Sequence, residues 1–255
     1  MKYFKVIGIM SLLVFSFYLT DFVTELAINS NPLMQTIQKN SNIYSTESVN
    51  AVIDKNTIIP GIKGKKINEM ESFLNMKDFG EFNINYLIYD DILPDISIEN
   101  NKEKVIISGN KSIREVSILV KNNNELVKYL KNNNIKYSKL IKNIDDIDNG
   151  ENINIVSDSN LFEDVDTLLN KKNINKRICI LNYSNIENCN KNKYYIVKPS
   201  LNINNRNLIS QLKNINNGDI ILIDENFTLN NLKILLNKIS NSDLKIVYLS
   251  EIIEE

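Results

Sequence analysis

Residues 218–224 read GDIILID and residues 244–252 read LKIVYLSEI, and these two stretches decide the fold. Each contains a short apolar run rich in Ile, Leu and Val that is bounded by polar residues, which is typical of a buried strand. Between them, residues 228–239 repeat Leu and Ile at three- and four-residue steps, which is typical of an amphipathic helix. Strand, helix and strand in this order predict a β/α unit with parallel strands.

The same alternation extends back to about residue 103. The predicted strands are 105–108, 116–120, 135–137, 153–156, 178–181, 194–197, 220–223 and 245–248. The predicted helices are 124–131, 161–170, 205–213 and 228–239. This order predicts an α/β fold over residues 103–255, with a parallel sheet or barrel and helices outside it.

The chain ahead of residue 103 has a different pattern. Residues 48–102 combine short strand-like runs, a helical run at 68–79 and a strand at 86–89, which predicts a small α+β module. Residues 28–47 read as a stalk, with Pro32 suited to a first helical turn. The sequence therefore predicts two folded parts behind an N-terminal segment.

That N-terminal segment has no charge from residue 6 to residue 20, with Lys2 and Lys5 ahead of it and Asp21 behind it. Apolar composition of this length favours a transmembrane signal-anchor over residues 1–27, and the alternative is a cleaved signal peptide. Lysines ahead of the span predict a cytoplasmic N-terminus, one pass through the cell membrane and an extracellular main domain.

Composition excludes several mechanisms. The chain has 255 residues, a formal net charge of −1 and no histidine. Without imidazole it cannot build a Ser-His-Asp triad, a Cys-His dyad or a His-ligated zinc site. The near-neutral charge also argues against a nucleic-acid partner.

Cys179 and Cys189 are the two cysteines, and they fall in the part predicted to lie outside the cell. The segment between them is long enough to bend back on itself, so a disulfide is one interpretation. Two free thiols, one of them buried in a strand, are the other.

The strand stretches also resemble a known family in order and spacing. Residues 218–224 are similar to a G-S-I-I-L-x-H strand, residues 244–252 to Y-x-F-V-T-L-S-E-L, residues 135–140 (IKYSKL) to V-K-A-T-F-F, and residues 149–160 (NGENINIVSDSN) in outline to N-G-H-E-I-G-N-H-S/T-x-x-H. These are motifs of the polysaccharide deacetylases, the NodB-homology domain family. The resemblance implies a distorted (β/α) barrel of about seven strands over residues 103–255.

The resemblance also assigns the family's site to positions in this chain. The catalytic base and the metal-binding aspartate fall on Lys121 and Asn122, the two metal-binding histidines on Val156 and Asn160, and the late histidine on Asp224. Valine cannot bind a metal and lysine brings a cation where the family needs a carboxylate. The substitutions predict that the chain holds no metal cofactor and lacks the deacetylase mechanism.

Two further features of the resemblance have plain structural alternatives. The family has an Arg-Pro motif along its glycan groove, and the corresponding residues here are Lys198, Pro199 and Ser200. The alternative interpretation is that these three residues form a turn that ends a strand. Asp224 follows an apolar strand, and catalytic groups of barrel proteins lie at the ends of such strands. The alternative interpretation is that Asp224 is a turn residue without a role in chemistry.

Two functions follow as hypotheses. The first is a membrane-anchored, catalytically inactive deacetylase-like protein that binds or organises cell-envelope glycan. The alternative is a weak or re-purposed carbohydrate hydrolase that acts on N-acetylated polysaccharide through Lys121, Asp224 and Glu225 without a metal. The partners predicted are therefore the cell membrane and a cell-wall or surface glycan.

Overall fold

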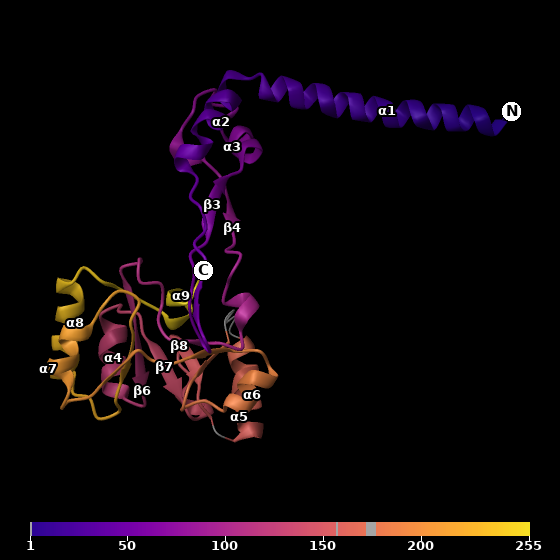
Figure 1. The fold of residues 1–255 in the computed structure, drawn as a ribbon. Coiled ribbons are helices and arrows are strands. Elements are labelled where there is room, and N and C mark those ends of the chain that lie inside the picture. Colours follow the sequence, from indigo (N-terminus) through magenta and orange to yellow (C-terminus); the bar gives the residue numbers. More distant parts are fainter. Residues whose placement is uncertain (1, 157, 172–176) are drawn as a thin grey trace. The chain divides into compact units, whose positions relative to one another are not determined.

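The computed structural model describes residues 2–156, 158–171 and 177–255 (Figure 1). The chain divides into two compact units, each described here by itself. The first unit comprises Met1–Ser48 and Lys63–Ile92, and the second comprises Val49–Ile62 and Leu93–Glu255. The second unit therefore contains all the segments that resemble the deacetylases.

The first unit combines helices with a two-stranded sheet. Its elements are α1 (Lys2–Asn29), α2 (Pro32–Tyr44), β3 (Gly64–Ile67), α3 (Glu69–Met76), η1 (Ile84–Tyr86) and β4 (Tyr89–Ile92), with β3 antiparallel to β4. At the start of α2 the Asn31 side chain accepts a hydrogen bond from the N–H of Leu33 at 2.9 Å, and Pro32 occupies the first turn, where no donor is needed. The core cluster contains Leu33, Met34, Ile37, Ile67, Phe73, Met76 and Leu87.

The helix α1 covers the segment predicted to cross a membrane. In the part of the chain that the structure describes, none of the helices has both the length and the apolar character needed for a membrane crossing. The uncharged run of fifteen residues between Lys5 and Asp21 measures about 22 Å as a helix, less than the ~30 Å hydrocarbon core. The predicted transmembrane helix at residues 1–27 is therefore unsupported.

The second unit contains two sheets. The five-stranded sheet has the order β1 (Val52–Asp54), β2 (Thr57–Ile59), β5 (Val105–Ile106), β10 (Tyr195–Val197) and β9 (Ile178–Ile180). The strands β1 and β2 form an antiparallel hairpin, and the remaining pairs are parallel.

The six-stranded sheet is parallel throughout. Its order is β11 (Leu201–Ile203), β12 (Ile220–Ile223), β6 (Glu115–Lys121), β7 (Ser138–Ile141) and β8 (Glu151–Asn154), and β13 (Lys245–Val247) pairs with the first residues of β6. The two sheets confirm the α/β prediction with parallel strands. The strands of the predicted barrel are thus divided between two hydrogen-bonded sheets.

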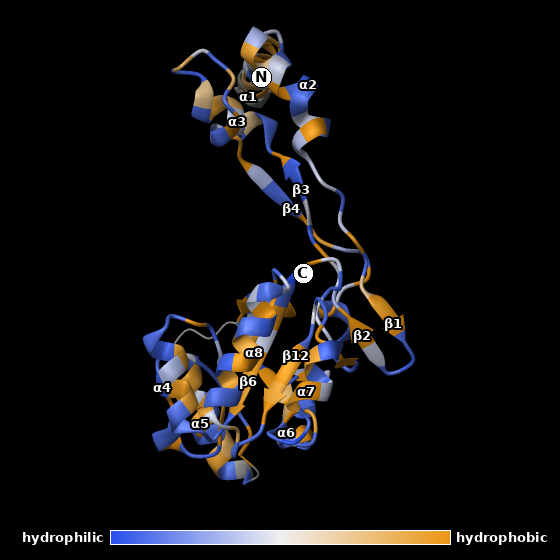
Figure 2. Ribbon diagram, turned by 90° about the vertical axis from the view of Figure 1, so that its left-hand side faces the viewer, coloured by the Kyte–Doolittle hydropathy of each residue, from blue (hydrophilic) through white to orange (hydrophobic). Residues whose placement is uncertain are grey.

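Helices cover the sheets, as the alternation predicts. They are α4 (Asn124–Asn132), α5 (Ser159–Lys171), α6 (Ile186–Lys191), α7 (Leu208–Gln211), α8 (Leu229–Asn241) and α9 (Leu249–Ile252), with the short turns η2 (Glu99–Asn101), η3 (Ile144–Asp146) and η4 (Leu212–Asn214). Figure 2 shows β6 and β12 mostly in the hydrophobic colour. Both strands are buried on their two faces, because helices cover one face and the second sheet's residues cover the other.

Three clusters fill this unit. The inner cluster joins residues of both sheets, among them Ile58, Leu119, Leu140, Ile178, Val197 and Leu222. A second cluster packs β6 and β12 against α4 and α8, and includes Val120, Leu126, Leu130, Ile221, Leu232 and Leu235. The third, called here the disulfide cluster, contains Ile141, Val156, Phe162, Val165, Leu169, Cys179, Cys189 and Tyr194.

The hairpin of β1 and β2 belongs to the larger unit rather than to the small module predicted at residues 48–102. The reason is strand pairing, because β2 lies parallel to β5 with Thr57 opposite Val105 and Ile58 opposite Ile106. Ile58 is 1% exposed and joins the inner cluster. A boundary drawn along the sequence cannot show this, since the pairing connects segments almost fifty residues apart.

Candidate functional site

The neighbouring strands β6 and β12 end side by side. Their register pairs Val120 with Ile223, so Lys121 at the end of β6 and Asp224 just after β12 lie at one edge of the sheet. The carboxyl ends of parallel strands are where α/β proteins usually bind ligands. Both residues line a pocket with a cavity volume of about 100 Å³, partly open to solvent, which we call the strand-end pocket. Its lining residues are Lys121, Tyr183, Asn202, Ile203, Asn204, Leu222 and Asp224.

Charges in the strand-end pocket are unevenly paired. The ammonium of Lys121 lies 3.7 Å from Oε2 of Glu225 and 5.6 Å from the centre of the Tyr183 ring. The carboxylate of Asp224 accepts a hydrogen bond from the N–H of Glu225 at 2.9 Å, and within the described residues no cation lies at ion-pair distance from it. Among the residues that the structure describes, the pocket therefore presents one paired ammonium and one carboxylate without a counter-ion.

Asn123 ties together the two loops beside the pocket. Its side-chain oxygen accepts the N–H of Leu126 at 3.1 Å and so caps α4. Its NH₂ group donates to the carbonyl oxygens of Glu225 at 2.8 Å and Phe227 at 3.1 Å. The preceding Asn122 has φ +40°, a conformation that asparagine tolerates better than most residues, and its side chain is exposed and does not line the pocket.

Three polar lining residues were missed by sequence reasoning. Asn204 uses its side-chain oxygen to accept the N–H groups of Arg206 at 2.9 Å and Asn207 at 3.0 Å, so its NH₂ group is the part left to a ligand. Asn202 is exposed, and its side chain makes no hydrogen bond to another described residue. Tyr183 packs against the inner cluster.

A signal for the asparagines was present in the sequence. Residues 201–204 read LNIN, and a strand with this alternation directs both asparagines to one side. Tyr183 had no comparable signal, because it lies in the turn after β9 and reaches the pocket through the chain's three-dimensional course.

The positions that the resemblance assigned to metal-binding histidines do not line the pocket. Val156 is 5% exposed and packs in the disulfide cluster beside Phe162. Asn160 is exposed in the first turn of α5, where its N–H donates to Asp158 at 2.9 Å. The structure therefore brings Lys121 and Asp224 together in one pocket, whose lining does not include Val156 or Asn160.

These residues do not fit the divalent metal that the resemblance implies. A catalytic metal needs several carboxylate, imidazole or thiolate ligands that converge on one point. Across residues 2–156, 158–171 and 177–255, no cluster of three His, Cys, Asp or Glu side chains is arranged in this way. In the strand-end pocket, Lys121 would repel the cation.

The groove candidates connect the two sheets. Lys198 is exposed and its N–H donates to the carbonyl of Ile106 at 2.8 Å, while Pro199 is buried. Ser200 makes two hydrogen bonds with the backbone of Ile220 in β12: its N–H donates to the carbonyl oxygen and its side-chain hydroxyl accepts the N–H, each at 2.9 Å. None of Lys198, Pro199 and Ser200 lines the strand-end pocket.

Cys179 of β9 and Cys189 of α6 are joined by a disulfide. Both are fully buried in the disulfide cluster. The bond ties α6 to the sheet, and the chain returns to β10 through a hydrogen bond from the N–H of Tyr194 to the carbonyl of Cys189 at 2.9 Å. Its position beside a packed core gives it a structural role.

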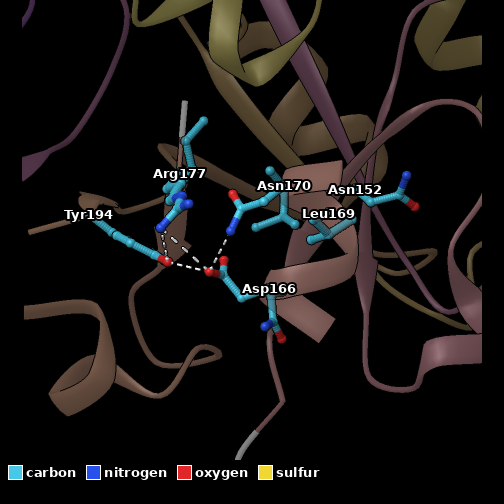
Figure 3. Close-up of a pocket in the computed structure, with 9 residues that line it drawn as sticks. Asn152, Asp166, Leu169, Asn170, Arg177 and Tyr194 are labelled. Carbon is cyan, nitrogen blue, oxygen red and sulfur yellow. Dashed lines mark hydrogen bonds and ion pairs between the residues drawn. The ribbon is translucent and has the colours of Figure 1, made fainter. Parts of the chain in front are cut away.

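A second pocket lies between α5 and β9, and its polar groups satisfy one another. Figure 3 shows Tyr194, Arg177 and Asn170 directed at the carboxylate of Asp166. The Tyr194 hydroxyl donates to Asp166 at 2.5 Å and accepts from Arg177 at 3.0 Å, and Arg177 lies 3.6 Å from the same carboxylate. Burial first, then the hydrogen bond to Asp166, raises the pKa of Tyr194 to about 12. We assign this pocket a structural role, since the groups are engaged in holding α5 to the sheet.

The fold of this chain has similar counterparts among solved structures. It is similar to wild-type BA3943 from Bacillus anthracis, described as a CE4 family pseudoenzyme, with a TM-score of 0.58 and 18% identity over 88% of this chain and 95% of that chain. A BA3943 mutant described as a CE4 family pseudoenzyme with restored enzymatic activity gives the same TM-score and identity over 88% of this chain and 98% of that chain. At this identity the similarity shows the fold.

Sequence comparison adds one partial match. Uncharacterized protein YlxY of Bacillus subtilis (strain 168) is 32% identical over 101 residues, which span 39% of this chain and 31% of that protein. No family model matches the chain. The chain therefore has the fold of the CE4 family pseudoenzyme BA3943, which confirms the resemblance to the polysaccharide deacetylases at the level of the fold.

Proposed function

We propose that this chain is a non-catalytic deacetylase-like protein that binds cell-envelope glycan in the strand-end pocket. One observation carries the proposal. The edge of the sheet where α/β proteins bind ligands holds a pocket with hydrogen-bonding groups and an aromatic ring. The side chains that line this pocket do not form a set of ligands suited to a metal ion.

The chemistry of the pocket suits a sugar ring. Lys121 and the NH₂ groups of Asn202 and Asn204 can donate to hydroxyl oxygens, and the Asp224 carboxylate can accept from hydroxyl groups. The Tyr183 ring adds a flat apolar surface. Directional polar groups around a small apolar area are the common composition of a site for a polar small ligand.

The disulfide supports an extracytoplasmic location for this function. Disulfides persist in oxidising compartments and are rare in the cytosol. The bond between Cys179 and Cys189 is therefore compatible with the extracellular main domain that the sequence predicts, where envelope glycan is accessible.

Binding of the full chain to purified peptidoglycan and to N-acetylglucosamine oligomers tests the proposal. Tyr183→Ala removes the aromatic surface of the pocket and is expected to weaken binding about tenfold, or ~1.4 kcal/mol. Tyr129→Ala is the matched control, because Tyr129 is also partly buried beneath a lysine, at 5.4 Å from Lys233, but lies on α4 outside the pocket. Absence of binding, or an equal effect of both variants, contradicts the proposal.

A weak hydrolase is the second candidate, favoured by the Asp224 carboxylate that has no counter-ion in the described part of the chain. Such a group can act as a general base. Acetate release from N-acetylglucosamine oligomers, abolished by Asp224→Asn and kept by Glu187→Gln on α6, would establish the hydrolase and overturn the non-catalytic proposal. We expect no acetate release above the uncatalysed rate.

A further inference from the structure

We propose that the strand-end pocket prefers glycan units that carry a free amino group, as de-N-acetylated hexosamines do, over N-acetylated units. This inference rests on the proposed glycan-binding function and names the ligand class of that same pocket. It depends on how the charged groups around the pocket are arranged.

The surroundings of the pocket are negative. Lys121 and Asp224 line it, and Glu225 lies directly beside Lys121. An open cavity with Glu225 and Glu125 in its wall lies at the adjacent ends of β6 and β12. The charged residues that line the two cavities are thus one lysine and three carboxylates, so the local field favours a ligand with positive charge.

The position of Lys121 leaves Asp224 to the ligand. The Lys121 ammonium lies 3.7 Å from Glu225 and over the ring of Tyr183, and its positive charge is compensated there. Asp224 receives only a backbone N–H from within the described residues, at 2.9 Å. A carboxylate retains further acceptor sites after one such bond, and a protonated amine supplies both donors and charge.

An N-acetyl group lacks these properties. It is neutral, with one amide donor, and therefore gains little from the field around Asp224. The hydroxyl groups of the two kinds of unit are the same, so contacts to Asn202 and Asn204 do not distinguish them. The charge near Asp224 is thus the feature of the pocket that sets the preference.

Isothermal titration of the full chain with the tetramers of glucosamine and of N-acetylglucosamine tests the inference. At about pH 6 the glucosamine amine is protonated, because an amine with electron-withdrawing neighbours, such as an α-amino group, has a pKa of roughly 8. The glucosamine tetramer should then bind about tenfold more tightly. The preference should shrink as salt is added, because the charges are partly exposed.

Two pocket variants should change the preference in opposite directions. Asp224→Asn should reduce the ratio of the two affinities to about one, whereas Lys121→Met should increase it by removing the competing ammonium. A misfolded variant would lose binding to both tetramers, so misfolding cannot explain a larger ratio of the two affinities. Glu187→Gln on α6 removes an exposed carboxylate away from the pocket and should keep the ratio of the parent.

The outcomes separate this inference from the proposed function. Equal or tighter binding of the N-acetylglucosamine tetramer overturns the inference and leaves the glycan-binding proposal intact. An equal effect of Glu187→Gln and Asp224→Asn also overturns it, because the preference would then reflect the overall charge. If neither tetramer binds, the proposed function and the inference both fail.

Discussion

Lys136 donates hydrogen bonds from its ammonium group to both carboxylate oxygens of Glu251, with Nζ–O distances of 2.6 and 2.8 Å. Oε2 of Glu251 also accepts the N–H of Tyr248 at 2.9 Å and so caps α9. Burial acts to raise the pKa of Glu251, but the bonds to Lys136 and Tyr248 and the lysine charge outweigh it and hold the pKa below its usual value.

This ion pair should make stability depend on acid pH. Because the folded-state pKa of Glu251 is lowered, its contribution is present above the unfolded pKa of about 4.3 and is lost as the pH falls through the folded value. Both side chains are more than a third exposed, so we expect the ion pair to contribute less than about 1 kcal/mol to the free energy of unfolding. Urea unfolding of Glu251→Gln should show this loss at neutral pH and none in acid. Combining it with Lys136→Gln should add little, and a difference constant with pH would count against the ion pair.

The disulfide should stabilise the second unit and resist reduction while the protein is folded. Replacing Cys179 and Cys189 by Ala should lower the free energy of unfolding by about 3 kcal/mol, since the bond closes a loop of ten residues in sequence separation. Because both cysteines are fully buried, thiol alkylation after mild reductant should be seen only when denaturant is also present. Rapid labelling of the native protein would contradict this.

Three buried tyrosines should make the fold sensitive to alkali. Burial is the largest cause that raises the pKa of Tyr137, Tyr194 and Tyr195, followed by hydrogen bonds to Asp148, Asp166 and Glu99. Folded values above the unfolded value of about 10 mean that this stabilisation is complete below about pH 10 and is lost as pH rises through the folded values.

Tyr194→Phe tests this alkaline dependence. It should cost about 1 kcal/mol near neutral pH by removing the bond to Asp166, and should make the loss of stability between about pH 10 and 12 less steep. Tyr129→Phe, outside these hydrogen-bond networks, is the control. An unchanged alkaline slope in Tyr194→Phe would show that Tyr194 does not contribute as stated.

The sequence predicted most elements of the sheets because their apolar residues follow the period of the structure. The predicted strand 220–223 coincides with β12, and the predicted helix 124–131 differs from α4 by one residue. Strand β7 was misplaced at 135–137. It contains Ser138, bonded to Glu151, and Lys139, bonded to the carbonyl of Asp146 at 2.6 Å. Such specific partners allow polar residues to be buried, and a hydropathy pattern does not reveal them.

The site was predictable only in part for a related reason. Lys121 and Asp224 each follow an apolar strand, so their place at the carboxyl edge could be read from the sequence. Tyr183 reaches the same pocket from a turn beside the other sheet. Its position depends on how the sheets pack, which no local pattern encodes.

Val156 offers the sharpest test of where the resemblance to the deacetylases ends. It is 5% exposed among apolar side chains of the disulfide cluster, while Asn122 and Asn160 are exposed after β6 and in α5. Val156→His would bury an imidazole without partners, and we expect it to cost about 2 kcal/mol or more. The resemblance implies that Asn122→Asp, Val156→His and Asn160→His together would create a zinc site.

The structure predicts the opposite result for that triple variant. Its free energy of unfolding should fall by about the cost of Val156→His, and its zinc affinity should stay within about tenfold of the parent in titrations. Val156→Ala separates the effects, because it removes packing, about 2 kcal/mol, and adds no polar group. The contrary result is a triple variant that stays as stable as the parent and binds one zinc at least a hundredfold more tightly. In that case the side chain at position 156 can turn toward positions 122 and 160, and the alignment with the family holds at the level of the site.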